Sequence, residues 1–171
     1  HSPCCGLPAH LLLAWGLYLP FLPTIPLSPK LRSFLPPSGK MQMSHFLPQR
    51  GPSPQPVATF SHASEIDGWV FLTGQMPTWP GEPERALPDG VEAQTRRVMD
   101  NLIIVLNGMD LELKNVAQAR VYLTQFERDY ATMNDTYQSY FEPGKLPART
   151  CIGVTGLAVG ALVEIDMVAK R

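Results

Sequence analysis

Two stretches near the C-terminal end decide the predicted fold: LPARTCIGV at residues 146–154 and ALVEIDMVA at residues 161–169. Apolar and polar side chains alternate along both with a period of two, which is typical of half-buried β-strands. We expect the two strands to pair as a hairpin, so that their apolar side chains form one face of a sheet. That face would carry Thr150, Ile152 and Val154 from the first strand and Val163, Ile165 and Met167 from the second.

The opposite face of this predicted pair brings three reactive side chains together. Arg149 and Cys151 belong to it from the first strand, and Glu164 from the second. Arginine has the side chain best shaped to hold a carboxylate, because its guanidinium group can donate two parallel hydrogen bonds. The pattern therefore indicates a site for a small anionic substrate, with Glu164 handling protons or water. Two simpler alternatives stay open: a surface ion pair of Arg149 with Glu164 or Asp166, and Cys151 as a small buried hydrophobe.

The composition is that of an ordinary globular protein and argues against nucleic-acid binding. The chain has 171 residues, 44% of them hydrophobic and 17% charged, and a formal net charge of −1. Residues 1–40 hold three basic residues and no acidic one. Over residues 41–171, 11 Lys and Arg therefore face 15 Asp and Glu, a formal charge of −4. This balance, without a basic cluster, is unfavourable for a polyanion, and we predict no nucleic-acid partner.

The N-terminal segment does not resemble the rest of the chain. Residues 1–40 contain eight of the 18 prolines, and the apolar run at residues 11–19 is too short to cross a bilayer. We interpret residues 1–45 as a disordered or non-native extension, with residues 46–171 forming the folded domain. We predict no membrane association.

Cysteine and histidine are too sparse for a metal centre or a histidine-based triad. Of the three cysteines only Cys151 lies in the predicted domain, and His62 is the only histidine beyond residue 45. No spacing matches a zinc site, so we predict no metal and no disulfide framework.

The remaining elements complete an α+β pattern. Asp67-Gly68 joins two strand-like runs at residues 57–65 and 69–76, as in a hairpin. Helical apolar spacing follows from residue 91 to 106, with Asp89 and Glu92 spaced as an N-terminal capping box. A strand is predicted at residues 116–123. A helix capped by Asp129 follows it, with Tyr130, Met133, Tyr137 and Tyr140 or Phe141 on its buried face. The order β-β-α-β-α-β-β indicates one mixed sheet with two helices on one face, and apolar residues on the other face would favour oligomers.

Several segments of the chain resemble those of the Rid family, the reactive intermediate deaminases. The resemblance rests on residues 60–63 (FSHA), 73–77 (TGQMP), 133–141 (MNDTYQSYF), 146–151 (LPARTC) and 163–166 (VEID), in family order. It implies a fold like that of the chorismate mutase of bacilli, assembled as a homotrimer with sites in the clefts between subunits. It also implies hydrolysis of enamines and imines such as 2-aminoacrylate and 2-iminopropanoate to 2-keto acids and ammonia, without a cofactor, in the cytoplasm.

The resemblance also assigns roles to particular residues. Arg149 matches the arginine that grips the substrate carboxylate, and Glu164 matches the glutamate that orients or activates water. The predicted substrate-binding set is Arg149, Cys151, Thr73, Gly74, Phe60 and Asn134. Phe60 departs from the family tyrosine, which removes a hydroxyl that could bond substrate or water. Thr73 stands where the family has serine and adds a methyl group.

Three other functions compete with the deaminase. A non-catalytic trimer could sense 2-keto acids or related metabolites in the same pocket, having lost activity through Phe60. A ribonuclease or translation inhibitor, activities attached to some members of the family, conflicts with the acidic balance of residues 41–171. A chorismate-mutase-like enzyme would have to hold a dicarboxylate with a single arginine. The presence of both Arg149 and Glu164 favours the deaminase.

Overall fold

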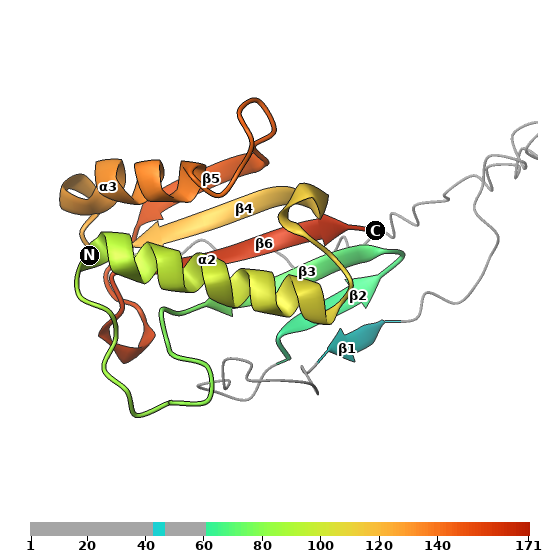
Figure 1. The fold of residues 1–171 in the computed structure, drawn as a ribbon, viewed down its shortest axis with the longest axis horizontal. Helices are drawn as coiled ribbons and strands as arrows, with labels where there is room; N and C mark the ends of the chain where they lie inside the picture. The colour runs from blue at the N-terminus through green and yellow to red at the C-terminus, as the bar shows by residue number, and fades with distance from the viewer. Residues whose placement is uncertain (1–42, 47–60) are drawn as a thin grey trace, which may run out of the picture. The chain divides into compact units, whose positions relative to one another are not determined.

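The computed structural model describes residues 43–46 and 61–171 (Figure 1). The predicted extension, apart from its last three residues, lies outside the described residues, as does Phe60. Within the described ranges the chain forms one sheet and two α-helices, which confirms the predicted α+β class.

Six strands form a mixed sheet in the order β1-β2-β3-β6-β4-β5. Their bounds are Ser44–Phe46 for β1, Ala63–Ile66 for β2, Trp69–Gln75 for β3, Val116–Leu123 for β4, Ala148–Gly153 for β5 and Val163–Lys170 for β6. Every neighbouring pair is antiparallel except β4 and β5, which are parallel. The three-residue strand β1 was not predicted, because it is too short to show a period.

The predicted hairpin at Asp67-Gly68 is confirmed. Ile66 pairs with Trp69 across a two-residue turn. Asp67 and Gly68 adopt φ values of 50° and 73°, as a type I′ turn requires. This turn sets the register that places Val70 and Leu72 in the core and leaves Trp69 and Phe71 exposed on the other face.

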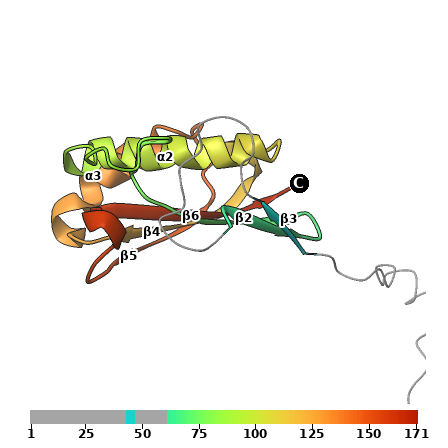
Figure 2. The same ribbon diagram turned by 90° about the horizontal axis from the view of Figure 1, so that it is seen from below.

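Both helices cover the same face of the sheet (Figure 2). Helix α2 spans Gly90–Gly108 and α3 spans Phe126–Gln138. The predicted apolar stripe of α2 faces the core, with Val98, Leu102 and Leu106 fully buried. Of the stripe predicted for α3, Met133 and Tyr137 are buried, whereas Tyr130 is 38% exposed. The packing of these buried side chains against the inner side chains of β3, β4 and β6 forms the hydrophobic core.

The predicted helix starts need correction. Asp89 is the N-cap of α2, but its side chain makes no capping hydrogen bond, and Glu92 pairs with Arg96 instead. Helix α3 begins three residues before Asp129, which is buried inside the helix and held by Arg128. A carboxylate at helical spacing marks the first turn of a helix without deciding which residue caps it.

The predicted C-terminal hairpin is wrong. Strand β5 pairs with β4 in parallel, and β6 lies between β3 and β4, so β5 and β6 are not neighbours. The physical reason is the helix between β4 and β5, because a strand, helix and strand in succession can return the chain parallel to its start. β5 becomes an edge strand, and its Thr150 and Ile152 are exposed instead of joining the core face.

Candidate functional site

The sheet register places Arg149 and Glu164 on opposite faces of the sheet. Arg149 lies beside Ala119, which is fully buried under the helices. Glu164 lies beside Tyr122, whose side chain belongs to the face without helices. The expectation that the two side chains share one face of a β5–β6 pair is therefore wrong. Each joins a different group of residues.

The first group holds Arg149 on the helix side of β5. Its Nη2 donates a hydrogen bond to Oδ1 of Asn134 on α3 at 2.7 Å. Its guanidinium carbon lies 4.9 Å from the centre of the Tyr137 ring, one turn further along α3. Arg149 makes no ion pair within residues 43–46 and 61–171. Its charge is thus oriented by a neutral amide and an aromatic face, and no carboxylate of the described residues pairs with it.

Tyr137 acts as a rigid platform beneath this guanidinium. Its side chain is 1% exposed, and its hydroxyl has no hydrogen-bond partner in the described part of the chain. Burial raises the pKa of Tyr137 to about 12, against a smaller opposing effect of Arg149. The phenol therefore stays neutral, and its ring supports the guanidinium. The sequence indicated only a core stripe at this position.

Cys151 shares the helix side of β5 with Arg149 and is half-buried. Burial raises the pKa of its thiol above the ordinary value of 9.0, although the charge of Arg149 works in the opposite direction. The neutral thiol is a poor nucleophile, which favours the interpretation of Cys151 as a small hydrophobe at the edge of the core.

The second group lies on the face without helices. Glu164 packs so closely against Gly74 of β3 that a methyl carbon built on Gly74 would lie 1.9 Å from its Oε1. The hydroxyl of the neighbouring Thr73 donates to the carbonyl oxygen of Ser61 at 2.7 Å, which leaves its lone pairs as acceptors. Burial, and then the charge of Asp166, raise the pKa of Glu164 above its ordinary value of 4.5. A carboxylate with a raised pKa suits proton transfer near neutral pH.

A cluster around the buried Asp166, beside Glu164, was missed by the sequence reasoning. Asp166 is 8% exposed and accepts hydrogen bonds from Arg120 Nε at 2.8 Å and from the Tyr122 hydroxyl at 3.1 Å. The alternative that Asp166 pairs with Arg149 is therefore wrong. The available signal was the period of two, which puts Arg120 and Tyr122 on one face of β4 and Glu164 and Asp166 on one face of β6.

Apolar side chains are also exposed on the face without helices. Trp69, Phe71 and Ile152 are 42%, 46% and 46% exposed, respectively.

Among the described residues, no three His, Cys, Asp or Glu side chains are grouped so that they could hold a metal ion. No helix within these residues is both long and apolar enough to span a membrane.

Known proteins resemble this chain in sequence and in fold. The family model described as endoribonuclease L-PSP matches residues 51–171. The protein DfrA of Myxococcus xanthus is 37% identical over 68% of this chain and 88% of its own length. The mouse 2-iminobutanoate/2-iminopropanoate deaminase is 30% identical over 70% of this chain and 86% of its own length. The crystal structure of RidA from Psychrobacter sp. PAMC 21119 superposes with a TM-score of 0.65 at 28% identity, covering 70% of this chain and 94% of that one. The chain therefore belongs to the endoribonuclease L-PSP family, which includes the Rid and RutC proteins.

Proposed function

We propose that this protein hydrolyses enamines and imines derived from 2-amino acids, releasing 2-keto acids and ammonia. The observation that carries the proposal is the oriented, unneutralised guanidinium of Arg149, a ready partner for a substrate carboxylate. The mouse relative named as an imine deaminase supports the same chemistry.

The proposal requires two subunits for each site. A three-carbon imine is too small to contact both faces of a β-sheet, so Arg149 and Glu164 of one chain cannot act on the same molecule. The exposed Trp69, Phe71 and Ile152 give the face without helices an apolar surface for association. In the proposed homotrimer, Arg149 of one subunit faces Glu164 of the partner subunit across a cleft.

Hydrolysis in this cleft needs no covalent intermediate. Arg149 holds the carboxylate, and 2-aminoacrylate takes a proton from solvent at its terminal carbon to become 2-iminopropanoate protonated on nitrogen. Glu164 of the partner subunit accepts a proton from water as the water oxygen bonds to the C=N carbon and the π electron pair moves to nitrogen. Glu164 passes this proton to nitrogen. The hydroxyl then gives its own proton to Glu164 as the C=O bond forms and the C–N bond breaks, so that pyruvate and ammonia leave and Glu164 returns the last proton to solvent. Because imines hydrolyse in water unaided, the site supplies orientation and proton transfer.

The test measures pyruvate release from freshly generated 2-iminopropanoate by the full chain and by its Arg149→Ala variant. We expect acceleration over buffer that disappears in the variant. Arg96→Ala is the matched control, because the ion pair of Arg96 with Glu92 on α2 is exposed, and the Tyr140 hydroxyl donates to the backbone oxygen of Arg96, which alanine keeps. Unchanged turnover in Arg149→Ala would refute the assignment. A folded protein that binds pyruvate without accelerating hydrolysis would instead identify a metabolite sensor.

A further inference from the structure

A hydrogen-bond network on the face without helices reaches from Glu164 to the neighbouring strand β4. Tyr122 of β4 lies directly opposite Glu164 of β6, and two residues earlier on β4 Arg120 lies opposite Asp166. Residues opposite each other in an antiparallel pair have Cβ atoms about 4.5–5.5 Å apart and side chains on the same face. Because β6 lies between β3 and β4 (Figure 1), Glu164 has Gly74 on one side and Tyr122 on the other.

The buried carboxylate of Asp166 determines the direction of the Tyr122 hydroxyl. Its Oδ1 accepts a hydrogen bond from Arg120 Nε at 2.8 Å, and its Oδ2 accepts one from the Tyr122 hydroxyl at 3.1 Å. A carboxylate paired with a guanidinium only accepts hydrogen bonds. The single proton of the phenol is therefore engaged by Asp166, and the lone pairs of the phenol oxygen are left for a donor from outside the sheet.

Tyr122 keeps this proton at neutral pH. Burial, followed by the hydrogen bond to Asp166 and its charge, raises the pKa of Tyr122 above the ordinary value of 10.0, against an opposing effect of Arg120. The charge of Glu164 acts more weakly in the same upward direction, so the phenol and this carboxylate interact. The neutral phenol thus offers a fixed acceptor oxygen beside Glu164.

Both hydroxyls around Glu164 are left as hydrogen-bond acceptors. The Thr73 hydroxyl donates its proton to a backbone carbonyl oxygen, as the Tyr122 hydroxyl donates its own to Asp166. The ion pair of Arg120 and Asp166 is neutral as a whole, so an ionised Glu164 leaves this group of side chains with one negative charge. Acceptor oxygens and a negative charge together favour a positively charged ligand group that carries N–H donors.

The group around Arg149 has the opposite character. Its guanidinium is positive and donates hydrogen bonds, and it pairs with no carboxylate among the described residues. In the proposed cleft, an acceptor group with a negative charge therefore faces a donor group with a positive one. A protonated imine of a 2-keto acid matches both, because it has a carboxylate at one end and an iminium with two N–H groups at the other.

We propose that Tyr122, positioned by Asp166 and Arg120, is a further substrate-binding residue that accepts one N–H of the substrate iminium while Glu164 accepts the other. The inference rests on the proposed hydrolysis in a cleft between subunits, and it adds a residue that distinguishes the substrate from its product. Hydrolysis replaces the nitrogen by a carbonyl oxygen, which has no proton to donate to Tyr122. The keto acid is therefore held less tightly than the iminium, which favours its release.

The test measures binding of L-alanine and of pyruvate to the full chain and to its Tyr122→Phe variant, by ligand-observed NMR titration. Both probes carry a carboxylate, but L-alanine has an ammonium with N–H donors where pyruvate has a carbonyl oxygen. The substitution keeps the ring and leaves the pair of Asp166 with Arg120 in place. Tyr130→Phe is the matched control, because it deletes the hydroxyl of a tyrosine on α3 that is 38% exposed and packs on Phe126.

We expect Tyr122→Phe to weaken L-alanine binding by about tenfold, the value of one hydrogen bond to a charged group, while pyruvate binding changes less than about twofold. KM for 2-iminopropanoate should rise by a similar factor, and Tyr130→Phe should change none of these values. Unchanged binding of L-alanine, an equal loss for both probes, or a parent protein that does not bind L-alanine would overturn the inference. If Arg149-dependent hydrolysis of 2-iminopropanoate persists in that case, the proposed function stands. If the selective loss of L-alanine occurs in a protein that hydrolyses no imine, the proposed function fails and Tyr122 remains part of an amine-binding site.

Discussion

The close contact between Gly74 and Glu164 makes Gly74→Ala a direct test of the catalytic role proposed for the Glu164 carboxylate. The added methyl carbon would lie 1.9 Å from Oε1, 2.8 Å from Cδ and 3.1 Å from Cγ of Glu164. Ordinary contact begins near 3.4 Å, so the carboxylate must move by about 1.5 Å, and it can do so because it is the far end of a flexible side chain. A displacement of about 1 Å in a catalytic group can cost about 100-fold in rate. We therefore expect kcat to fall about 30- to 100-fold while the fold is kept.

The assay follows pyruvate release from 2-iminopropanoate over a range of substrate concentrations. KM should change less than about threefold, because the proposed grip on the substrate carboxylate comes from Arg149, which does not touch Gly74. Circular dichroism and the oligomeric state serve as controls for folding. A Gly74→Ala variant with parental kcat would refute the role of Glu164, and a large rise in KM at constant kcat would move that residue from catalysis to binding.

Three further predictions concern the groups around Arg149 and Glu164. Asn134→Ala removes the 2.7 Å hydrogen bond to Arg149 and should raise KM about tenfold. Asn134→Asp should raise KM further, because the new carboxylate would neutralise the guanidinium of Arg149. Steady-state kinetics measures KM for both variants. Tyr137→Phe keeps the ring and deletes an unpartnered buried hydroxyl, so thermal unfolding and kcat should show no loss of stability or activity. Asp166 raises the pKa of Glu164, so the kcat profile of Asp166→Asn should have its acidic limb at lower pH than that of the parent, because Glu164 stays ionised further into acid. An acidic limb that stays in place would separate Glu164 from the proton transfer.

Local patterns in the sequence predicted the elements well and their pairing less well. The Asp67-Gly68 turn and the apolar stripe of α2 depend on neighbouring residues, and both are confirmed. The stripe of α3 is confirmed except at Tyr130, which is exposed. The position of β5 depends on a distant partner. The alternation of apolar and polar side chains in residues 146–154 separates the two faces of a strand, but it does not show which face packs against the core. Both faces of an edge strand stay partly exposed, so the hydrophobicity of the side chains alone does not identify the face that packs against the core.

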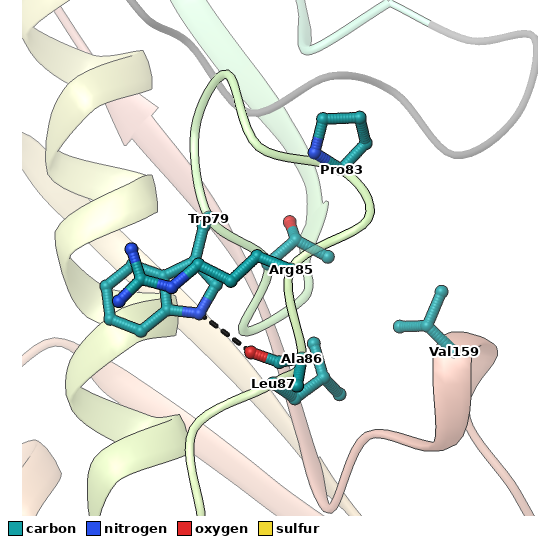
Figure 3. A pocket seen from close by; sticks show the side chains of 7 residues that line it. Trp79, Pro83, Arg85, Ala86, Leu87 and Val159 are labelled. Atoms are coloured by element: carbon teal, nitrogen blue, oxygen red, sulfur yellow. Dashed lines mark hydrogen bonds between the residues drawn. The ribbon is translucent and has the colours of Figure 1, made fainter.

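The same limit applies to the candidate site. Arg149, Asn134 and Glu164 were singled out from the sequence, and the structure places the first two in contact. Their separation from Glu164 follows from the register of β4 with both β5 and β6, which no short motif encodes. The Arg120 and Asp166 pair joins residues 46 positions apart. The pocket lined by Trp79, Arg85 and Val159 (Figure 3) depends on contacts between residues that are apart in the sequence. These are the hydrogen bond from Trp79 to the Ala86 carbonyl oxygen and the one from the buried Asn101 amide of α2 to the Met76 carbonyl oxygen.

Activity in mixed oligomers tests the proposed sharing of the site between subunits most directly. Arg149→Ala and Glu164→Gln subunits, each inactive alone, are unfolded together in equal amounts and refolded. If each cleft takes Arg149 from one subunit and Glu164 from the next, random mixing makes about one cleft in four intact, and about a quarter of parental activity should return. Mixtures as inactive as the separate variants, with exchange of subunits verified, would contradict a site shared between subunits.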